Sequence, residues 1–190
     1  MEGKIIPLGR ALRGVVSLAR TGWMLRGVPP GEAETVASHS YAAAVIAFEL
    51  AVEASKKGFR VDPYKAASLA LVHDLAEGVI GDISRRAGIG EAKRRAEEEA
   101  FKALGVSEEA KKLFMEFEEG STLESRVARI AELLATYWMS LIYTCRGYDV
   151  AEIGESSWRE ALELASRDGI VELIYSLRGK LSVECSGGLR

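Results

Sequence analysis

In the stretch Leu69–Asp82, LALVHDLAEGVIGD, the end of an apolar helical run is followed directly by one histidine and three acids. A helix start is predicted just upstream, because Asp62 can cap the first free amides and Pro63 needs no hydrogen-bond donor in the first turn. If that helix continues through the stretch, His73 and Glu77 lie about 40° apart around its axis. The stretch therefore predicts a helical segment that presents an imidazole and carboxylates on one flank.

Helical patterns continue along the rest of the chain and predict an all-α fold. Prolines and glycines interrupt them, since neither residue continues a helix easily. No stretch longer than a few residues alternates apolar and polar positions as a half-buried strand does. Helices are expected over residues 8–24, 33–57, 63 to the quoted stretch, 91–104, 108–118, 121–146, 156–166 and 170–177, with Ser121 and Glu124 as a capping box before the longest one.

Size, charge and cysteine usage narrow the class of protein. A chain of 190 residues, 48% of them hydrophobic, supports one buried core, so we expect a single domain over 1–190 with a frayed tail over 183–190. A net charge of -3 gives no pull toward a nucleic acid polymer or an acidic membrane surface, and the uncharged, strongly apolar stretch 133–145 is too short for a membrane span. No leader pattern is present, and Cys145 and Cys185 show no paired framework, so a reducing, cytoplasmic location is expected.

The two histidines of the chain, His39 and His73, both lie in apolar or alanine-rich helical contexts. A single buried histidine is more often a core residue with a satisfied hydrogen bond than a metal ligand. Here the second histidine is joined directly to Asp74, which favours a shared site. Imidazole nitrogen together with carboxylate oxygen suits zinc, manganese, iron or cobalt better than magnesium or calcium.

One acid stands in an otherwise uncharged segment, because Glu132 is the only charged residue of Ile130–Cys145. A buried carboxylate without a partner is costly, or its pKa shifts until the group is neutral, so Glu132 needs a partner. Two kinds of partner stay open. One is a metal ion shared with the histidines, and the other is Arg126 or Arg129 at a rim position near the helix start.

Two further pairs of residues are candidates for ligand contacts. Glu77 and Asp82 follow the histidine, where the helix dipole opposes negative charge, so either a cation balances them or they face water. Arg20 and Trp23 flank a glycine before a loop; arginine suits bidentate phosphate binding, and tryptophan can wall a sugar or base. Taken alone, this second pair is explained equally well by helix-end packing and surface charge.

In chain order, the segments RTGWMLRGV, ETVASHSYAAAVIA, LALVHDLAEGVIGDI and RIAELLATY resemble the HD-domain phosphohydrolases of the YfbR-like 5'-deoxynucleotidase group. The resemblance covers about residues 11–147 and leaves helices at about 156–178 outside it. It implies an HD-domain helical bundle that releases phosphate from (deoxy)nucleoside 5'-monophosphates. It also suggests a homodimer, with the segment GIVELIYSL at 169–177 either as contact surface or as part of the protomer's own core.

The resemblance also implies a role for each candidate residue. A divalent cation, drawn from Mn, Co, Zn, Fe or Mg, would be held by His39, His73, Asp74 and Glu132. The catalytic acids would be Glu77 and Asp82, while Arg20 would bind phosphate and Trp23 would line the deoxyribose pocket. Such an ion acidifies water and neutralises phosphate oxygens, and a nearby carboxylate gives general acid or base assistance.

Two positions depart from the family pattern. Glu132 stands where the family has aspartate, and Ser38 replaces an acid beside His39, which removes an expected contact to that ligand. Two alternatives therefore stay open. Instead of hydrolysing a nucleoside monophosphate, the chain could be an HD phosphohydrolase that acts on a nucleoside triphosphate or other nucleotide, or a nucleotide-binding HD module without turnover.

Overall fold

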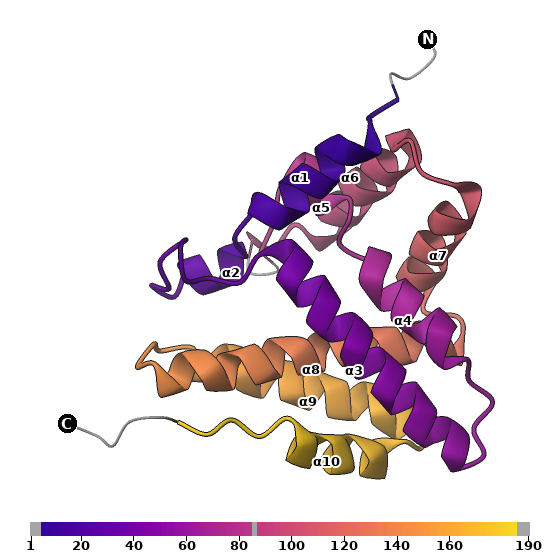
Figure 1. The fold of residues 1–190 in the computed structure, drawn as a ribbon, viewed down its shortest axis with the longest axis vertical. Helices are drawn as coiled ribbons and strands as arrows, with labels where there is room; N and C mark the ends of the chain where they lie inside the picture. The colour runs from indigo at the N-terminus through magenta and orange to yellow at the C-terminus, as the bar shows by residue number, and fades with distance from the viewer. Residues whose placement is uncertain (1–4, 85–86, 186–190) are drawn as a thin grey trace.

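The protein is described by a computed structural model covering residues 5–84 and 87–185 (Figure 1). Within these residues the chain forms ten helices and no β-strand beyond two isolated bridges, which confirms the all-α class. The helices are α1 (Leu8–Ser17), α2 (Thr21–Met24), α3 (Val36–Lys56), α4 (Pro63–Val72), α5 (Glu77–Ile80), α6 (Gly90–Ala103), α7 (Glu108–Glu119), α8 (Leu123–Cys145), α9 (Ala151–Asp168) and α10 (Val171–Lys180).

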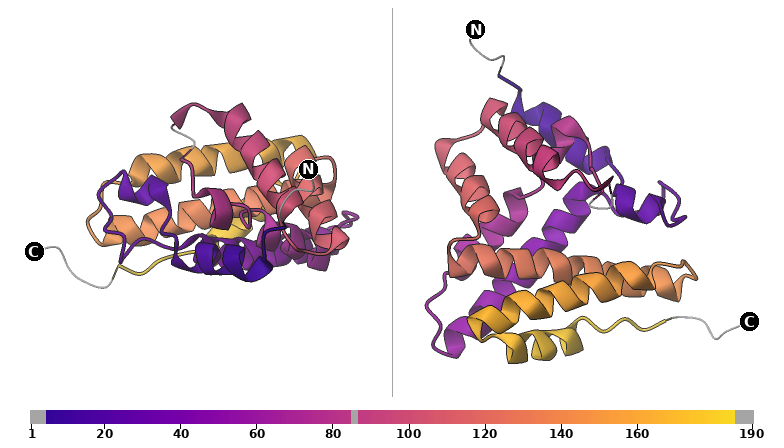
Figure 2. Two further views of the ribbon diagram at one scale, coloured as in Figure 1. Left: turned by 90° about the horizontal axis from the view of Figure 1, so that it is seen from above. Right: turned by 180° about the vertical axis from the view of Figure 1, so that it is seen from behind.

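Four helices, α3, α4, α8 and α9, form the main core. Helix α3 packs against α4 and α8, and α8 packs along α9. Alanines on the facing surfaces, such as Ala43, Ala47 and Ala131, are fully buried and let the helix axes come close. Figures 1 and 2 show α8, α9 and α10 side by side, with α1, α5, α6 and α7 in the other half of the molecule. No described helix is both long and apolar enough to cross a bilayer.

Local capping signals fix several helix starts. The Asp62 side chain accepts hydrogen bonds from two amides of the first turn of α4, with Pro63 at the first position, which confirms that prediction. The predicted capping box of Ser121 and Glu124 is wrong, because Thr122 caps α8 and exchanges hydrogen bonds with Ser125. Glu124 instead accepts a hydrogen bond from the backbone amide of Asp62.

Two predicted helices are shorter than their patterns indicated. The expected helix over 8–24 breaks into α1 and α2, because the chain between them is extended and pairs with the segment before α3. Backbone hydrogen bonds join Arg20 to Glu34 and Val36 to Leu18. Helix α4 ends at Val72, so His73 and Glu77 do not share one continuous helix and the 40° relation does not apply.

Two glycines allow α5 to lie directly on α1. A Cβ atom added at Gly14 would stand 2.1 Å from the backbone oxygen of Gly78, and one added at Gly78 would stand 2.2 Å from the backbone oxygen of Ala11. Both distances are far below van der Waals contact. The close approach anchors the segment that follows His73 against the N-terminal part of the chain.

The end of the described chain returns to the end of α8. Cys145 and Cys185 form a disulfide with their Cα atoms 5.3 Å apart, so the prediction of unpaired cysteines is wrong. Their pairing depends on α9 and α10 folding back between them, which residue spacing does not reveal. The disulfide fixes residues 183–185 of the expected frayed tail, and 186–190 lie outside the described residues. The cysteines therefore no longer support a reducing compartment, and the cytoplasmic location stays a prediction.

Candidate metal centre and adjoining pocket

Three of the predicted metal ligands lie together in the interior. His39 comes from α3, and His73 and Asp74 directly follow α4. One ligand atom from each lies within 4.8 Å of the others. The Oδ2 atom of Asp74 is 3.1 Å from Nε2 of His73 and 4.0 Å from Nε2 of His39. All three residues are buried, so the cluster lies in the interior rather than on the surface.

The inward-facing histidine nitrogens make no hydrogen bond within the described residues, although carboxylate oxygens of Asp74 and Glu132 lie close to Nε2 of His73. Nδ1 of His73 is 2.7 Å from the backbone oxygen of Ala70, and a carbonyl only accepts, so this nitrogen donates. Nε2 of His73 and both ring nitrogens of His39 are buried without a hydrogen bond. Because buried unpaired polar atoms are costly, these nitrogens fit the ligand set of a transition-metal ion.

The electrostatics of the cluster also favour a positive charge among these residues. Burial lowers the pKa of His73, but the carboxylates of Asp74 and Glu132 outweigh it and raise that pKa to about 10. Burial opposes ionisation of Asp74, yet the neighbouring His73 and Arg20 hold its pKa well below the usual range. In the metal-free protein a proton thus occupies a place that a cation can take.

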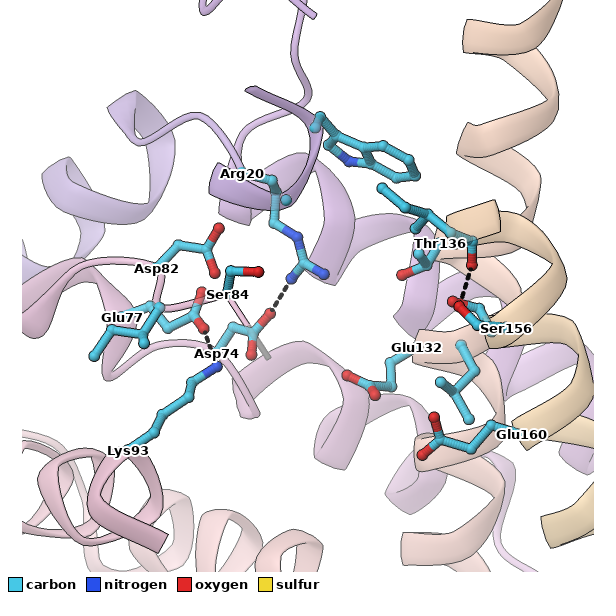
Figure 3. Close-up of a pocket in the computed structure, with 16 residues that line it drawn as sticks. Arg20, Asp74, Glu77, Asp82, Ser84, Lys93, Glu132, Thr136, Ser156 and Glu160 are labelled. Carbon is cyan, nitrogen blue, oxygen red and sulfur yellow. Dashed lines mark hydrogen bonds and ion pairs between the residues drawn. The ribbon is translucent and has the colours of Figure 1, made fainter. Parts of the chain in front are cut away.

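The fourth predicted ligand comes from the middle of α8. Oε2 of Glu132 lies 3.4 Å from Nε2 of His73, and Figure 3 shows the Glu132 side chain directed into the pocket. Arg126 instead pairs with Asp168, and Arg129 donates to backbone oxygens at the end of α7. The structure therefore brings Glu132 to the histidines, as the metal alternative requires.

Glu77 is buried beside this cluster, with 1% of its surface exposed, which contradicts the alternative that it faces water. Its Oε1 atom lies 3.0 Å from Nζ of Lys93, which comes from α6. Burial, and then the charge of Asp74, raise the pKa of Glu77 to about 8 against the opposing effect of Lys93 and Arg20. Glu77 therefore keeps a proton near neutral pH and can donate it.

Arg20 and Asp82 connect the N-terminal segment to the histidine segment. Nη1 of Arg20 lies 2.9 Å from Oδ2 of Asp74. The Asp82 carboxylate accepts the backbone N–H of Thr21, and the Thr21 hydroxyl donates to the backbone oxygen of Asp82 at 2.8 Å. These contacts place a guanidinium beside the candidate metal ligands. Figure 3 shows Arg20 and Asp82 on the same side of the pocket.

These residues surround one pocket of about 230 Å³. Trp23 lines it and is itself 2% exposed. The opposite wall comes from α8 and from α9, which begins five residues before its predicted start. Sequence reasoning missed Lys93, Ser84 and the residues of that opposite wall, namely Thr136, Ile153, Ser156, Ser157 and Glu160. One end of the pocket thus offers charged groups and the other offers hydroxyl, carboxylate and apolar contacts.

The sequence is similar to one protein family and to several proteins of known function. The HD domain family profile matches residues 16–167. The fission yeast 5'-deoxynucleotidase hdd1 is 29% identical over 66% of this chain and 65% of its own length. Human 5'-deoxynucleotidase HDDC2 is 35% identical over 58% of this chain and 53% of its own. The match therefore spans between about half and two thirds of these curated relatives.

Solved structures show the same architecture. The PH0347 protein of Pyrococcus horikoshii is 31% identical, with a TM-score of 0.72 over 87% of this chain and 98% of that one. A Pyrococcus furiosus protein is 32% identical with the same TM-score over 88% and 98%. An HD-domain phosphohydrolase of Listeria innocua, 21% identical, has a TM-score of 0.64 over 91% and 87%, and at that identity it supports the fold alone.

Proposed function

Because the chain belongs to the HD domain family, we propose that it is a metal-dependent phosphohydrolase that releases phosphate from (deoxy)nucleoside 5'-monophosphates. The observation that carries this proposal is the set of buried histidine nitrogens without a hydrogen bond, which lie next to Asp74, a residue that lines the same pocket as Arg20. The names of the curated relatives support the substrate class, because they are 5'-deoxynucleotidases.

In this proposal four residues, from three separate parts of the chain, would hold one divalent cation: His39, His73, Asp74 and Glu132. Manganese, cobalt, zinc and iron suit this mixture of nitrogen and oxygen donors better than magnesium. When bound, the ion would supply positive charge to the phosphate oxygens and lower the pKa of water. The longer side chain of Glu132, in place of aspartate, still reaches 3.4 Å from Nε2 of His73.

Other side chains of the pocket act on the substrate directly. Arg20 offers two N–H groups in one plane, a geometry that matches phosphate oxygens, and would turn one edge toward the phosphate while keeping its contact with Asp74. Glu77, which carries a proton near neutral pH, would donate it to the departing 5'-oxygen of the nucleoside. Asp82 would orient the attacking water, and Trp23 would pack against the deoxyribose.

Metal reconstitution tests the proposal. The metal-free protein is given Mn²⁺, Co²⁺, Zn²⁺, Fe²⁺ or Mg²⁺ singly, and phosphate release is measured from deoxynucleoside and ribonucleoside monophosphates and from triphosphates. We expect turnover of monophosphates, loss of activity in Asp74→Ala, and kept or raised activity in Glu132→Asp. The exposed Glu109→Ala variant serves as a matched control. Pyrophosphate or triphosphate as the product would favour a triphosphohydrolase, and nucleotide binding without turnover would favour a binding module.

We also propose that the protein is a homodimer. In the segment 169–177, Ile170, Ile174 and Leu177 are buried in the protomer's own core, so these apolar side chains are not available as contact surface. Support comes instead from α1, where Leu12 and Val16 are 47% and 61% exposed on one helix face. Light scattering of the purified protein measures the mass, and a monomer at all concentrations would contradict this proposal.

A further inference from the structure

We propose that Glu34 is a positioning residue that, through one buried carboxylate, orients His39 toward the metal ion and holds Trp23 in the wall of the pocket. The proposal rests on the proposed function in one respect, namely that His39 binds a metal ion. It adds a residue that lies outside the pocket lining and that neither the sequence patterns nor the resemblance singled out.

The carboxylate of Glu34 lies between the two residues it serves. Its Oε1 atom accepts a hydrogen bond of 2.8 Å from Nε1 of Trp23. The same atom is 3.8 Å from Nδ1 of His39. Only 2% of the Glu34 side chain is exposed, and His39 is fully buried. Water therefore does not compete for either contact, so each depends on where this carboxylate stands.

The backbone of Glu34 is held from two further directions. Its N–H donates to the hydroxyl of Tyr143, near the end of α8, at 2.7 Å. Its carbonyl accepts the backbone N–H of Arg20 at 2.9 Å. Glu34 thus connects the segment that carries the candidate phosphate-binding arginine with the long helix that carries Glu132. Because its backbone is held at both the N–H and the carbonyl, Glu34 can hold in place the two side chains that its carboxylate contacts.

The chemistry of histidine explains why a carboxylate is needed here. The Nε2 atom of His39 faces Asp74 and is the nitrogen placed to bind an ion, which leaves Nδ1 to face Glu34. A metal-bound histidine ordinarily donates its other ring N–H to a carboxylate or carbonyl, which sets the ring orientation and makes the ligand more basic. The 3.8 Å gap is short enough for a small side-chain rotation to close it into a hydrogen bond.

Glu34 also accounts for the departure at Ser38. The family pattern has an acid at that position, next to the first histidine ligand. In this protein Ser38 is exposed, and its hydroxyl lies 2.9 Å from the hydroxyl of Thr35, away from His39. The carboxylate near the ring comes from Glu34, one helical turn earlier in the chain. The serine therefore removes no acid that His39 uses.

The test compares Glu34→Gln with Glu32→Gln in the intact protein. Both changes remove one carboxylate from the same segment, but Glu32 is exposed and its side chain accepts a hydrogen bond from the Tyr148 hydroxyl, away from His39 and Trp23. Calorimetric titration of the metal-free proteins with Zn²⁺ should give a dissociation constant about 10- to 100-fold higher for Glu34→Gln and an unchanged one for Glu32→Gln. When the metal ion is saturating, the kcat of Glu34→Gln should be reduced by a smaller factor than its affinity for the metal.

A second readout follows the indole of Trp23 by NMR. The chain has three tryptophans, so a Trp23→Phe variant assigns the signal. In the wild-type protein the Trp23 indole N–H signal should shift when Zn²⁺ is added, because Glu34 contacts both side chains. In Glu34→Gln that response should be lost. Glu34→Asp, which keeps the charge, should restore part of the zinc affinity and serves as the test variant if Glu34→Gln does not fold.

The outcomes separate this inference from the proposed function. If the wild-type protein binds Zn²⁺ and releases phosphate while Glu34→Gln binds Zn²⁺ equally tightly with the same Trp23 response, the inference is wrong and the function stands. The same holds if Glu34→Asp is no better than Glu34→Gln. If the wild-type protein does not bind Zn²⁺ and no metal ion supports turnover, the proposed function fails as well.

Discussion

The buried acid Glu77 should make the metal-free protein less stable as the pH rises. Its pKa in the folded protein is about 8, compared with an ordinary value of 4.5. Because the pKa is raised on folding, Glu77 ionises in the unfolded chain at a lower pH than in the folded protein. The free energy of unfolding therefore decreases as the pH rises from about 4.5 to about 8. Replacing Glu77 by glutamine removes this titration and keeps the size of the side chain.

The size of the effect follows from the two pKa values. At about 1.36 kcal/mol per pKa unit, Glu77→Gln should be more stable than the wild-type protein by ~3 kcal/mol at pH 7 and by ~5 kcal/mol at pH 8.5. Near pH 4.5 the difference should shrink to less than about 1 kcal/mol, because the carboxyl is then neutral in the folded protein and only half ionised in the unfolded chain. Lys93 keeps a partner in the variant, since Glu97 lies 3.3 Å from its Nζ.

Urea denaturation of the metal-free proteins between pH 4.5 and 8.5 measures these differences. The matched control is Glu99→Gln on α6, whose side chain is 76% exposed, and it should stay within about 0.5 kcal/mol of the wild type throughout. A stability gain that does not change with pH would mean that packing, not ionisation, is responsible. A wild-type protein that is the more stable form at pH 8.5 would refute the reasoning.

Three further predictions concern the ion, the disulfide and a glycine contact. Adding Mn²⁺ at 100 times its dissociation constant should stabilise the metal-free protein by about 2.7 kcal/mol in calorimetry, and Asp74→Asn should abolish the gain. Reducing the disulfide opens a loop with a sequence separation of 40 and should lower the free energy of unfolding by about 4 kcal/mol; equal urea midpoints before and after reduction would contradict this. Gly78→Ala should cost about 2 kcal/mol or more, because its Cβ would stand 2.2 Å from a backbone oxygen, whereas Gly9→Ala meets no atom within 4 Å and should be tolerated in the same assay.

Features that depend on neighbouring residues could be predicted from the sequence. Asp62 caps α4 as expected. Ser107 caps α7 in the same way and Gly120 ends it in a left-handed conformation, because each of these interactions spans only a few residues. The chain has few histidines and one of them adjoins an acid, and this pattern alone predicts a shared metal site for His39 and His73. The structure places the two residues together.

Features that depend on packing between distant segments were missed. Lys93 lies in the charged run EAKRRAEEE, where nothing local distinguishes it from Arg94, and only the docking of α6 beside α5 buries it against Glu77. Glu34 lies in the extended segment before α3, and its contacts with Trp23 and Tyr143 depend on tertiary structure. Hydrophobic periodicity reports which face of a helix is buried, but not which helix covers it.

The pocket residues fall into two groups, according to whether they lie between the two disulfide-bonded cysteines in the sequence. Helix α9 and its residues Ser156 and Glu160 lie inside the covalent loop between Cys145 and Cys185, whereas the candidate metal ligands and Arg20 all lie outside it. Oxidation therefore ties the α9 side of the pocket to the end of α8 through a covalent bond, whereas the candidate metal ligands and Arg20 are held in place by noncovalent packing alone.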